Sequence, residues 1–201
     1  MDLSINQLVS ETKKAVCGKG YDFGIALDIA KAVEILAPYP FDLSSALTDF
    51  LKNEDSKPCN ISVKDEQAIT VSGCAGLLSV IGAMDLFLSK DYQSLSFEEV
   101  QNPCLSLGLI AMRQSPYFGS FGLPSGISIS QMLQQGQFLD LQSVVIEKTA
   151  FTPLPMTDWP ARISIDDDAY ELLKTFAHKT YVPSSEASRA AGAGAGLTDN
   201  D

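Results

Sequence analysis

The stretch SINQLVSETKKAVCGKGYDFGIALDIAKAVEILAPYPFDLSSALTDFL, residues 4–51, decides the fold of the N-terminal part of this chain. Its apolar residues recur at helical spacing and are interrupted twice, at Gly18–Gly20 and at Pro38–Pro40. Glycine commonly ends helices, and proline cannot continue them. The stretch therefore predicts three helices joined by short turns in a compact antiparallel cluster, over residues 4–16, 23–36 and 43–51.

The residues that precede these helices support the same prediction. Ser4, with Gln7 three residues later, forms a capping-box pattern, in which each polar side chain satisfies a backbone amide at the start of the helix. Asp42 stands in the capping position before the third helix. Two of the three predicted helices therefore have a defined first residue.

After residue 51 the pattern changes from helical to mixed. Residues 60–72 alternate around a polar break at 64–67, which predicts a hairpin or two short strands. Residues 73–88 are apolar nearly all round and predict a buried central helix. Residues 92–100 fit a strand but leave the choice open. Asn102-Pro103 is a typical helix start, although a strand is nearly as compatible with the apolar run that follows.

The C-terminal third combines loops, short strands and one more helix. Residues 115–126 form a long loop rich in glycine, proline and aromatic residues, and such loops are often functional or mobile. A proline-rich connection separates strands expected at 144–146 and 162–165, and a helix follows the Asp166 cap. The chain is thus predicted to be a single α+β domain over residues 1–201, with an N-terminal three-helix cluster, a mixed sheet and helix region, and an extended C-terminal tail, residues 180–201.

Charge and length limit the function classes. The 201 residues include 25 acids and 14 basic residues, giving a formal net charge of −11. Nucleic-acid binding needs clustered Lys and Arg, and an anionic membrane surface attracts basic segments. The composition therefore argues against both partners and favours a soluble protein.

Cysteine usage and the N-terminal residues favour the cytoplasm. The four cysteines lie far apart, without a Cys-x-x-Cys pair, and their spacing does not suggest a disulfide scaffold. The N-terminus lacks the basic and apolar regions of a signal peptide. The run 73–88 is shorter than the ~20 residues that span a bilayer and carries Asp85.

Two stretches resemble the beginning and the end of a bacterial family called domain of unknown function 3726. The first contains Lys13-Lys14-Ala15, then Gly18, Gly20, Gly24 and the segment Ala30-Lys31-Ala32-Val33. The second contains Tyr181-Val182-Pro183-Ser184-Ser185-Glu186-Ala187-Ser188-Arg189, Gly192-Ala193-Gly194-Ala195-Gly196 and Asp199-Asn200-Asp201. The resemblance implies a bacterial member of this fold family. It implies no activity or catalytic residue, because the family carries none.

The tail holds the main candidate site. Ser184, Ser185 and Glu186 follow a proline and can begin a short helix, whose exposed amides favour a carboxylate or phosphate. Arg189 could bind the same anion through charge-assisted hydrogen bonds. The alternative is that Ser and Glu only cap a helix, that Arg189 pairs with an acid, and that the glycine-spaced end is flexible.

Two residues outside the tail could assist such a site. His178, the only histidine, could act as a base beside Ser184 or Ser185, or it could interact only with the C-terminal dipole of its helix. Asp85 is the only charge in an apolar run, so it needs a partner or a raised pKa if it is buried. Pairing with Arg113 or Arg162 would make it structural, and exposure to solvent would leave it without a role.

Two further groups of residues have side chains suited to a site. Asp199, Asn200 and Asp201 offer oxygen ligands, but carboxylates at a chain end are more often solvated, and no metal site is predicted. The loop aromatics Tyr117, Phe118 and Phe121 could line a pocket, form a subunit contact, or lie in the core beneath the loop.

Two functional hypotheses follow. The first is a self-associating or accessory cytoplasmic protein, a homo-oligomer whose tail docks on folded protein through apolar anchors and small residues. The second is an enzyme or binding protein for a small anionic metabolite, with Ser184, Ser185, Glu186 and Arg189 forming the pocket and Asp85 or His178 assisting. The sequence specifies neither a reaction nor a cofactor.

Overall fold

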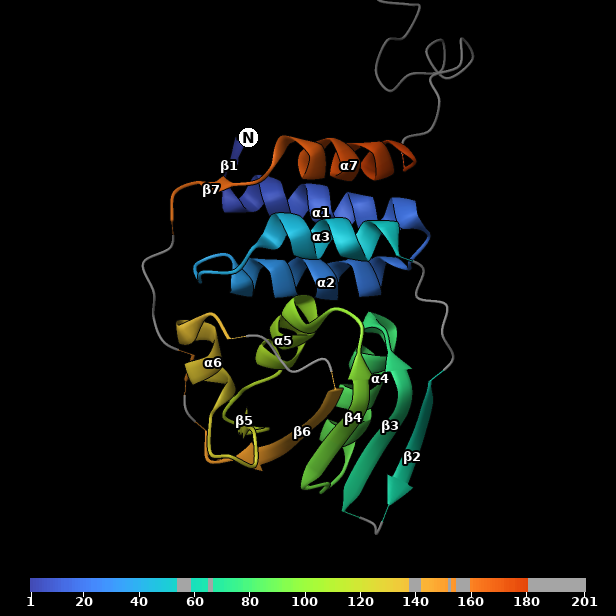
Figure 1. Cartoon of the computed structure of the whole chain (residues 1–201), viewed down its shortest axis with the longest axis vertical. Helices are drawn as coiled ribbons and strands as arrows, with labels where there is room; N and C mark the ends of the chain where they lie inside the picture. Colours follow the sequence, from blue (N-terminus) through green and yellow to red (C-terminus); the bar gives the residue numbers. More distant parts are fainter. Residues whose placement is uncertain (54–58, 65–66, 138–141, 152, 155–159, 181–201) are drawn as a thin grey trace, which may run out of the picture.

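The computed structural model describes residues 1–53, 59–64, 67–137, 142–151, 153–154 and 160–180. Within them the chain has the α+β architecture expected from the sequence. Four helices whose axes are roughly aligned form a layer at one end of the molecule. A mixed sheet with its own helices forms the other end (Figure 1).

The helical layer contains α1 (Ile5–Lys19), α2 (Phe23–Leu36), α3 (Leu43–Lys52) and α7 (Asp167–His178). The three predicted N-terminal helices and the predicted last helix are confirmed. Ser4 and Gln7 form the full capping box, and the Asp42 side chain accepts a hydrogen bond from the Ser45 amide. A small antiparallel sheet pairs β1 (Asp2–Leu3), which precedes α1, with β7 (Ile163–Ser164), which precedes α7.

The larger sheet has the strand order β2-β3-β4-β6-β5. β3 and β4 are parallel, and the other neighbours are antiparallel. The parallel pair needs a crossover, which α4 (Leu77–Ser89) supplies. β2 and β5 are the outer strands. The strands are β2 (Asn60–Lys64), β3 (Ala68–Ala75), β4 (Ser94–Val100), β5 (Ser120–Gly122) and β6 (Gln142–Thr149).

The two faces of this sheet differ in chemistry. On one face the side chains are aliphatic or aromatic and buried, as in Ile69 of β3 and Leu95 of β4. On the other face the neighbouring positions are small hydroxyl residues, among them Ser62, Thr70 and Ser96, which are partly exposed. This alternation is that of a sheet with one face in the core and one open to solvent.

α5 (Pro103–Ala111) connects the two parts of the molecule. Every residue from Cys104 to Ala111 is buried, and the helix lies between the helical layer and the sheet (Figure 1). The sequence left open whether this apolar run is a helix or a strand. A Cβ added at Gly108 would come within 2.9 Å of the Ala32 carbonyl oxygen and of Leu36, so glycine allows α5 to approach α2 closely.

The predicted central helix begins later than expected. Residues 73–88 were predicted to be helical from Gly73, but β3 continues to Ala75 and α4 begins at Leu77. Gly73 has a φ of 83°, and the β3–β4 register shifts between Val71 and Cys74. A bulge interrupts the alternation of buried and exposed side chains along a strand. β3 therefore continues past the position at which the sequence pattern no longer resembles a strand.

The C-terminal half contains elements that the sequence analysis missed. The expected loop 115–126 includes β5, and α6 (Ile129–Gln135) follows it. α6 has the same capping box as α1, formed by Ser128 and Gln131, so its signal was present in the sequence. Of the loop aromatics, Phe121 is buried, whereas Tyr117 is 93% and Phe118 47% exposed.

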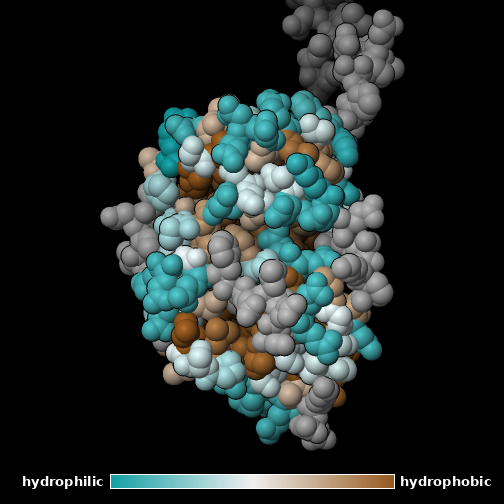
Figure 2. All heavy atoms as spheres, in the orientation of Figure 1, coloured by the Kyte–Doolittle hydropathy of each residue, from teal (hydrophilic) through white to brown (hydrophobic). Residues whose placement is uncertain are grey.

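Figure 2 shows how polarity is distributed over one face of the molecule. Hydrophilic residues cover most of the helical layer, and hydrophobic residues gather lower down, over the region of β5 and β6. All four cysteines are free thiols, as the spacing suggested.

The close contact at Gly108 predicts a large effect of a single methyl group. We expect Gly108→Ala to lower the free energy of unfolding by about 1–3 kcal/mol, because the methyl group meets the α2 backbone and overpacks the core. The matched control is Gly82→Ala in α4, where a Cβ meets open space and the substitution should stabilise by about 0.5–1 kcal/mol. Urea unfolding of both variants measures the difference, and equal effects would contradict the packing argument.

Candidate functional site

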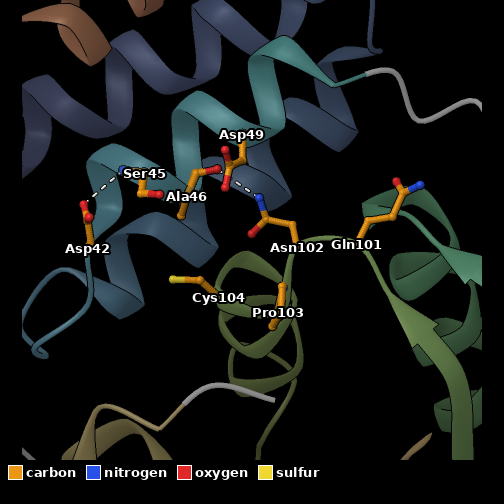
Figure 3. A pocket seen from close by; sticks show the side chains of 8 residues that line it. All are labelled: Asp42, Ser45, Ala46, Asp49, Gln101, Asn102, Pro103 and Cys104. Carbon is orange, nitrogen blue, oxygen red and sulfur yellow. Dashed lines mark hydrogen bonds between the residues drawn. The ribbon is translucent and has the colours of Figure 1, made fainter. Parts of the chain in front are cut away.

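A cavity of about 400 Å³ opens between α3 and the beginning of α5 (Figure 3). Its volume is in the range of small-molecule sites. Two segments far apart in sequence form it, and the lining residues are Asp42, Ser45, Ala46, Asp49, Gln101, Asn102, Pro103 and Cys104.

Asn102 holds the two sides of the cavity together. It precedes α5 as its N-cap, and its side-chain oxygen accepts a hydrogen bond of 3.0 Å from the Leu105 amide. Its side-chain nitrogen donates to the Ala46 carbonyl oxygen of α3 at 2.9 Å (Figure 3). Both polar ends of this buried side chain are therefore satisfied, and the amide fixes the start of α5 against α3.

The cavity is acidic. Asp42 and Asp49 both line it from α3, and Asp42 also caps that helix. The described lining contains no lysine or arginine. Two carboxylates with nearby hydroxyl and amide groups favour a cation or a hydrogen-bond donor over an anion.

Cys104 lies at the α5 side of this cavity and is buried. Burial raises the pKa of its thiol from about 9.0 to about 12, and the negative charge of Asp42 adds to the increase. A thiol reacts as a nucleophile only in its thiolate form, so Cys104 is inert at neutral pH.

A second cavity, of about 480 Å³, lies between α3 and the beginning of α7. Its lining includes Asp166, Asp167, Asp168 and Lys52. The Ser44 hydroxyl accepts a hydrogen bond of 3.0 Å from the Asp166 amide, which joins α3 to the start of α7. This cavity is likewise mainly acidic.

Asp85 was predicted as a site residue and is found in an ion pair. Its carboxylate accepts hydrogen bonds of 2.9 and 3.1 Å from Arg113, which also contacts Asp28 of α2 at 3.1 Å. The Asp85 side chain is 62% exposed, whereas that of Arg113 is only 11% exposed. Arg113 was one of the two partners considered from the sequence, and this pairing connects α4 with α2.

The other predicted site residues are not brought to Asp85. His178 is exposed in the last turn of α7, and α7 and α4 lie in different parts of the molecule (Figure 1). Ser184, Ser185, Glu186 and Arg189 lie outside the described residues, as do Asp199 and Asp201. In the part of the chain that the structure describes, no cluster of three or more His, Cys, Asp or Glu side chains could hold a metal ion.

Sequence reasoning did not find the cavity, although it recognised several of its residues. Asp42 and Asn102 were read only as helix caps. Asp42 and Asp49 are seven residues apart, which places them on one face of α3. That signal could have suggested an acidic helix face, but not that the start of α5 lies opposite.

Residues 3–73 match the family described as protein of unknown function DUF3726. This segment of the chain is similar to the DUF3726 family. It contains α1, α2 and α3, β2 and most of β3, and therefore only the α3 side of the cavity. The predicted family resemblance is confirmed over this segment, while the tail lies outside it.

Comparison with curated proteins gives no match. None of the helices in the described ranges is both long enough and apolar enough to cross a membrane.

The raised pKa of Cys104 predicts a specific pH dependence. The folded protein holds this proton more tightly than the unfolded chain, so stability falls as pH rises from about 9 towards 12. The contribution of one thiol is up to about 1.4 kcal/mol per pH unit. Urea unfolding at pH 8, 9 and 10 should show a shallower decline for Cys104→Ala than for the unsubstituted protein. Identical slopes would contradict this assignment.

Proposed function

We propose that this protein is an accessory protein of the cytoplasm that associates with copies of itself through the outer edge of β2. The observation that supports this proposal is the exposure of aliphatic side chains on that strand. Ile61 is 38% and Val63 is 48% exposed. Both are on the same face as the buried Ile69 and Val71 of the neighbouring strand. They therefore extend the apolar face of the sheet onto its outer strand, where it is partly exposed.

Edge strands carry unpaired backbone groups that can pair with another chain. Soluble proteins usually protect such edges with proline, lysine or other charged residues, bulges or a covering element. Of these, β2 carries one lysine, Lys64, as its last residue. β2 contains no proline and no acidic residue, and its pairing with β3 is regular over all five positions. Its central residues, Ile61, Ser62 and Val63, are uncharged.

A contact beside the start of β2 joins this strand to α4. The thiol of Cys59, next to the first residue of β2, lies 2.7 Å from the Ser79 hydroxyl in the first turn of α4. Leu78, the neighbour of Ser79, is 42% exposed. The beginning of β2 thus contacts α4, and edge pairing together with apolar burial is a common recognition mode.

Other exposed apolar residues support self-association less well. Phe23 and Leu27 lie one turn apart on α2, where the helix satisfies its own backbone. The Lys13 ammonium group lies 5.2 Å from the centre of the Phe23 ring and shields it. Tyr117 and Phe118 project from a loop without an extended run of backbone donors and acceptors.

The predicted docking of the tail, residues 180–201, remains part of the proposal. Thr180 is exposed just beyond the end of α7, and the residues after it lie outside the described chain. Support comes from the sequence, which places Tyr181, Val182 and Pro183 directly after this point, followed by small residues. The alternative anionic site at residues 184–189 also stays a prediction, and the acidic cavities do not favour it.

We expect the double variant Ile61→Lys and Val63→Lys to abolish self-association. Two cations on the same face of β2 would repel their counterparts in a second copy and would remain solvated in the free subunit. Light scattering at micromolar concentration should give a multiple of the chain mass for the unsubstituted protein and one chain mass for the variant. Leu27→Lys, which changes an exposed aliphatic residue on α2, should leave the mass unchanged. A monomeric unsubstituted protein would refute the proposal.

Tail docking has a separate test. Deletion of residues 190–201 should lower the melting temperature if the tail contacts its own subunit, or lower the mass if it contacts a neighbour. Calorimetry and light scattering measure the two effects. If neither value changes, the tail does not dock.

A further inference from the structure

We infer that two copies of the chain pair antiparallel through β2 about a two-fold axis at Ser62. The two sheets then form one continuous sheet across the dimer. This inference rests on the proposed self-association and specifies its symmetry and register.

The direction of the backbone groups in β2 is fixed by its pairing with β3. The Ser62 hydroxyl donates to the Thr70 carbonyl oxygen, and the Ser72 hydroxyl donates to the Asn60 carbonyl oxygen, each at 3.3 Å. These carbonyl groups therefore lie in the space between the two strands. Successive residues of a strand direct their backbone groups to opposite sides. Asn60 and Ser62 thus direct theirs towards β3.

The neighbouring strand gives the same result independently. The Ser94 amide of β4 donates to the Gln67 carbonyl oxygen, so residue 67 and its alternate neighbour Ile69 face β4. Residues 68 and 70 then face β2, as the first argument requires. Ile61 and Val63 consequently direct their amide and carbonyl groups away from β3, to the outer edge of the described sheet.

With a two-fold axis at Ser62, all of these outward amide and carbonyl groups form hydrogen bonds between the two copies. In an antiparallel pair centred there, Ile61 lies opposite Val63 of the partner subunit, and Val63 lies opposite the partner subunit's Ile61. Residues whose backbone groups point towards each other in this way exchange both hydrogen bonds. The two symmetric pairs thus satisfy the amide and carbonyl of Ile61 and Val63 in both copies.

The side chains also match in this register. The two opposed pairs are aliphatic, and cross-strand aliphatic pairs stabilise a sheet. Asn60 lies opposite the partner subunit's Lys64, so no like charges meet along the five paired residues. Ser62 meets its own counterpart on the hydroxyl face of the sheet, where two small side chains fit. A self-complementary strand of this kind is what a two-fold interface requires.

An engineered disulfide tests this register directly. Ser62 would be at a non-hydrogen-bonded position, where the Cα atoms of opposed residues are about 4.5 Å apart. Disulfides form at Cα separations of about 4.4–6.8 Å. In a Cys59→Ser background, which removes the nearest native thiol, Ser62→Cys should form a covalent dimer in air. Non-reducing electrophoresis and intact mass should show most of the protein in this form.

The control is Ser72→Cys in the same background. Ser72 also lies on the hydroxyl face, but on β3, one strand away from the axis, and should give little covalent dimer. If the unsubstituted protein is dimeric, and the Ile61 and Val63 lysine variant is monomeric, but Ser62→Cys does not form the cross-link, then the register is wrong while self-association stands. If the unsubstituted protein is monomeric, the proposed function and this inference both fail.

Discussion

The burial of α5 between two layers is the constraint on which the rest of the structure depends. All residues from Cys104 to Ala111 are shielded from water, because the helical layer and the sheet cover the helix together. Its contact with α2 requires glycine at position 108. Burying an all-apolar helix supplies the hydrophobic driving force that joins the two parts of the molecule.

Polar residues at the two ends of α5 fix its position. At its beginning, Asn102 bonds simultaneously to the first turn of α5 and to α3. Just after its end, Arg113 contacts Asp28 of α2 and Asp85 of α4. These directional contacts fix the position of the apolar helix along its own axis. Hydrophobic burial alone does not specify that position, because it is non-directional. The acidic cavity beside Asn102 is a consequence of this arrangement, because it lies where α5 begins next to α3.

Local signals in the sequence predicted the helices but not their assembly. The capping hydrogen bonds of Ser4, Asp42 and Asn102 come from amides three residues away, so the local pattern identified these caps correctly. Gly73 was misread because a bulge extends β3 into a run that is apolar on all sides. The cavity joins residues 42–49 to residues 101–104, a pairing that depends on the path of the whole chain between them. Asp85 is an intermediate case. The sequence offers Arg113 as one of two possible partners, but it does not decide between them.

Net charge and the composition of β2 have opposite effects on association. With a charge of −11 on each copy, two chains repel one another over distances up to the screening length, about 10 Å at 0.1 M salt. An interface between copies must therefore be short-ranged and free of acids where it forms. β2 meets both conditions, because it contributes outward backbone groups, two aliphatic side chains and no carboxylate. In the dimer proposed above, backbone pairing at the edge of the sheet would offset this repulsion, which contacts elsewhere on the acidic surface would not do.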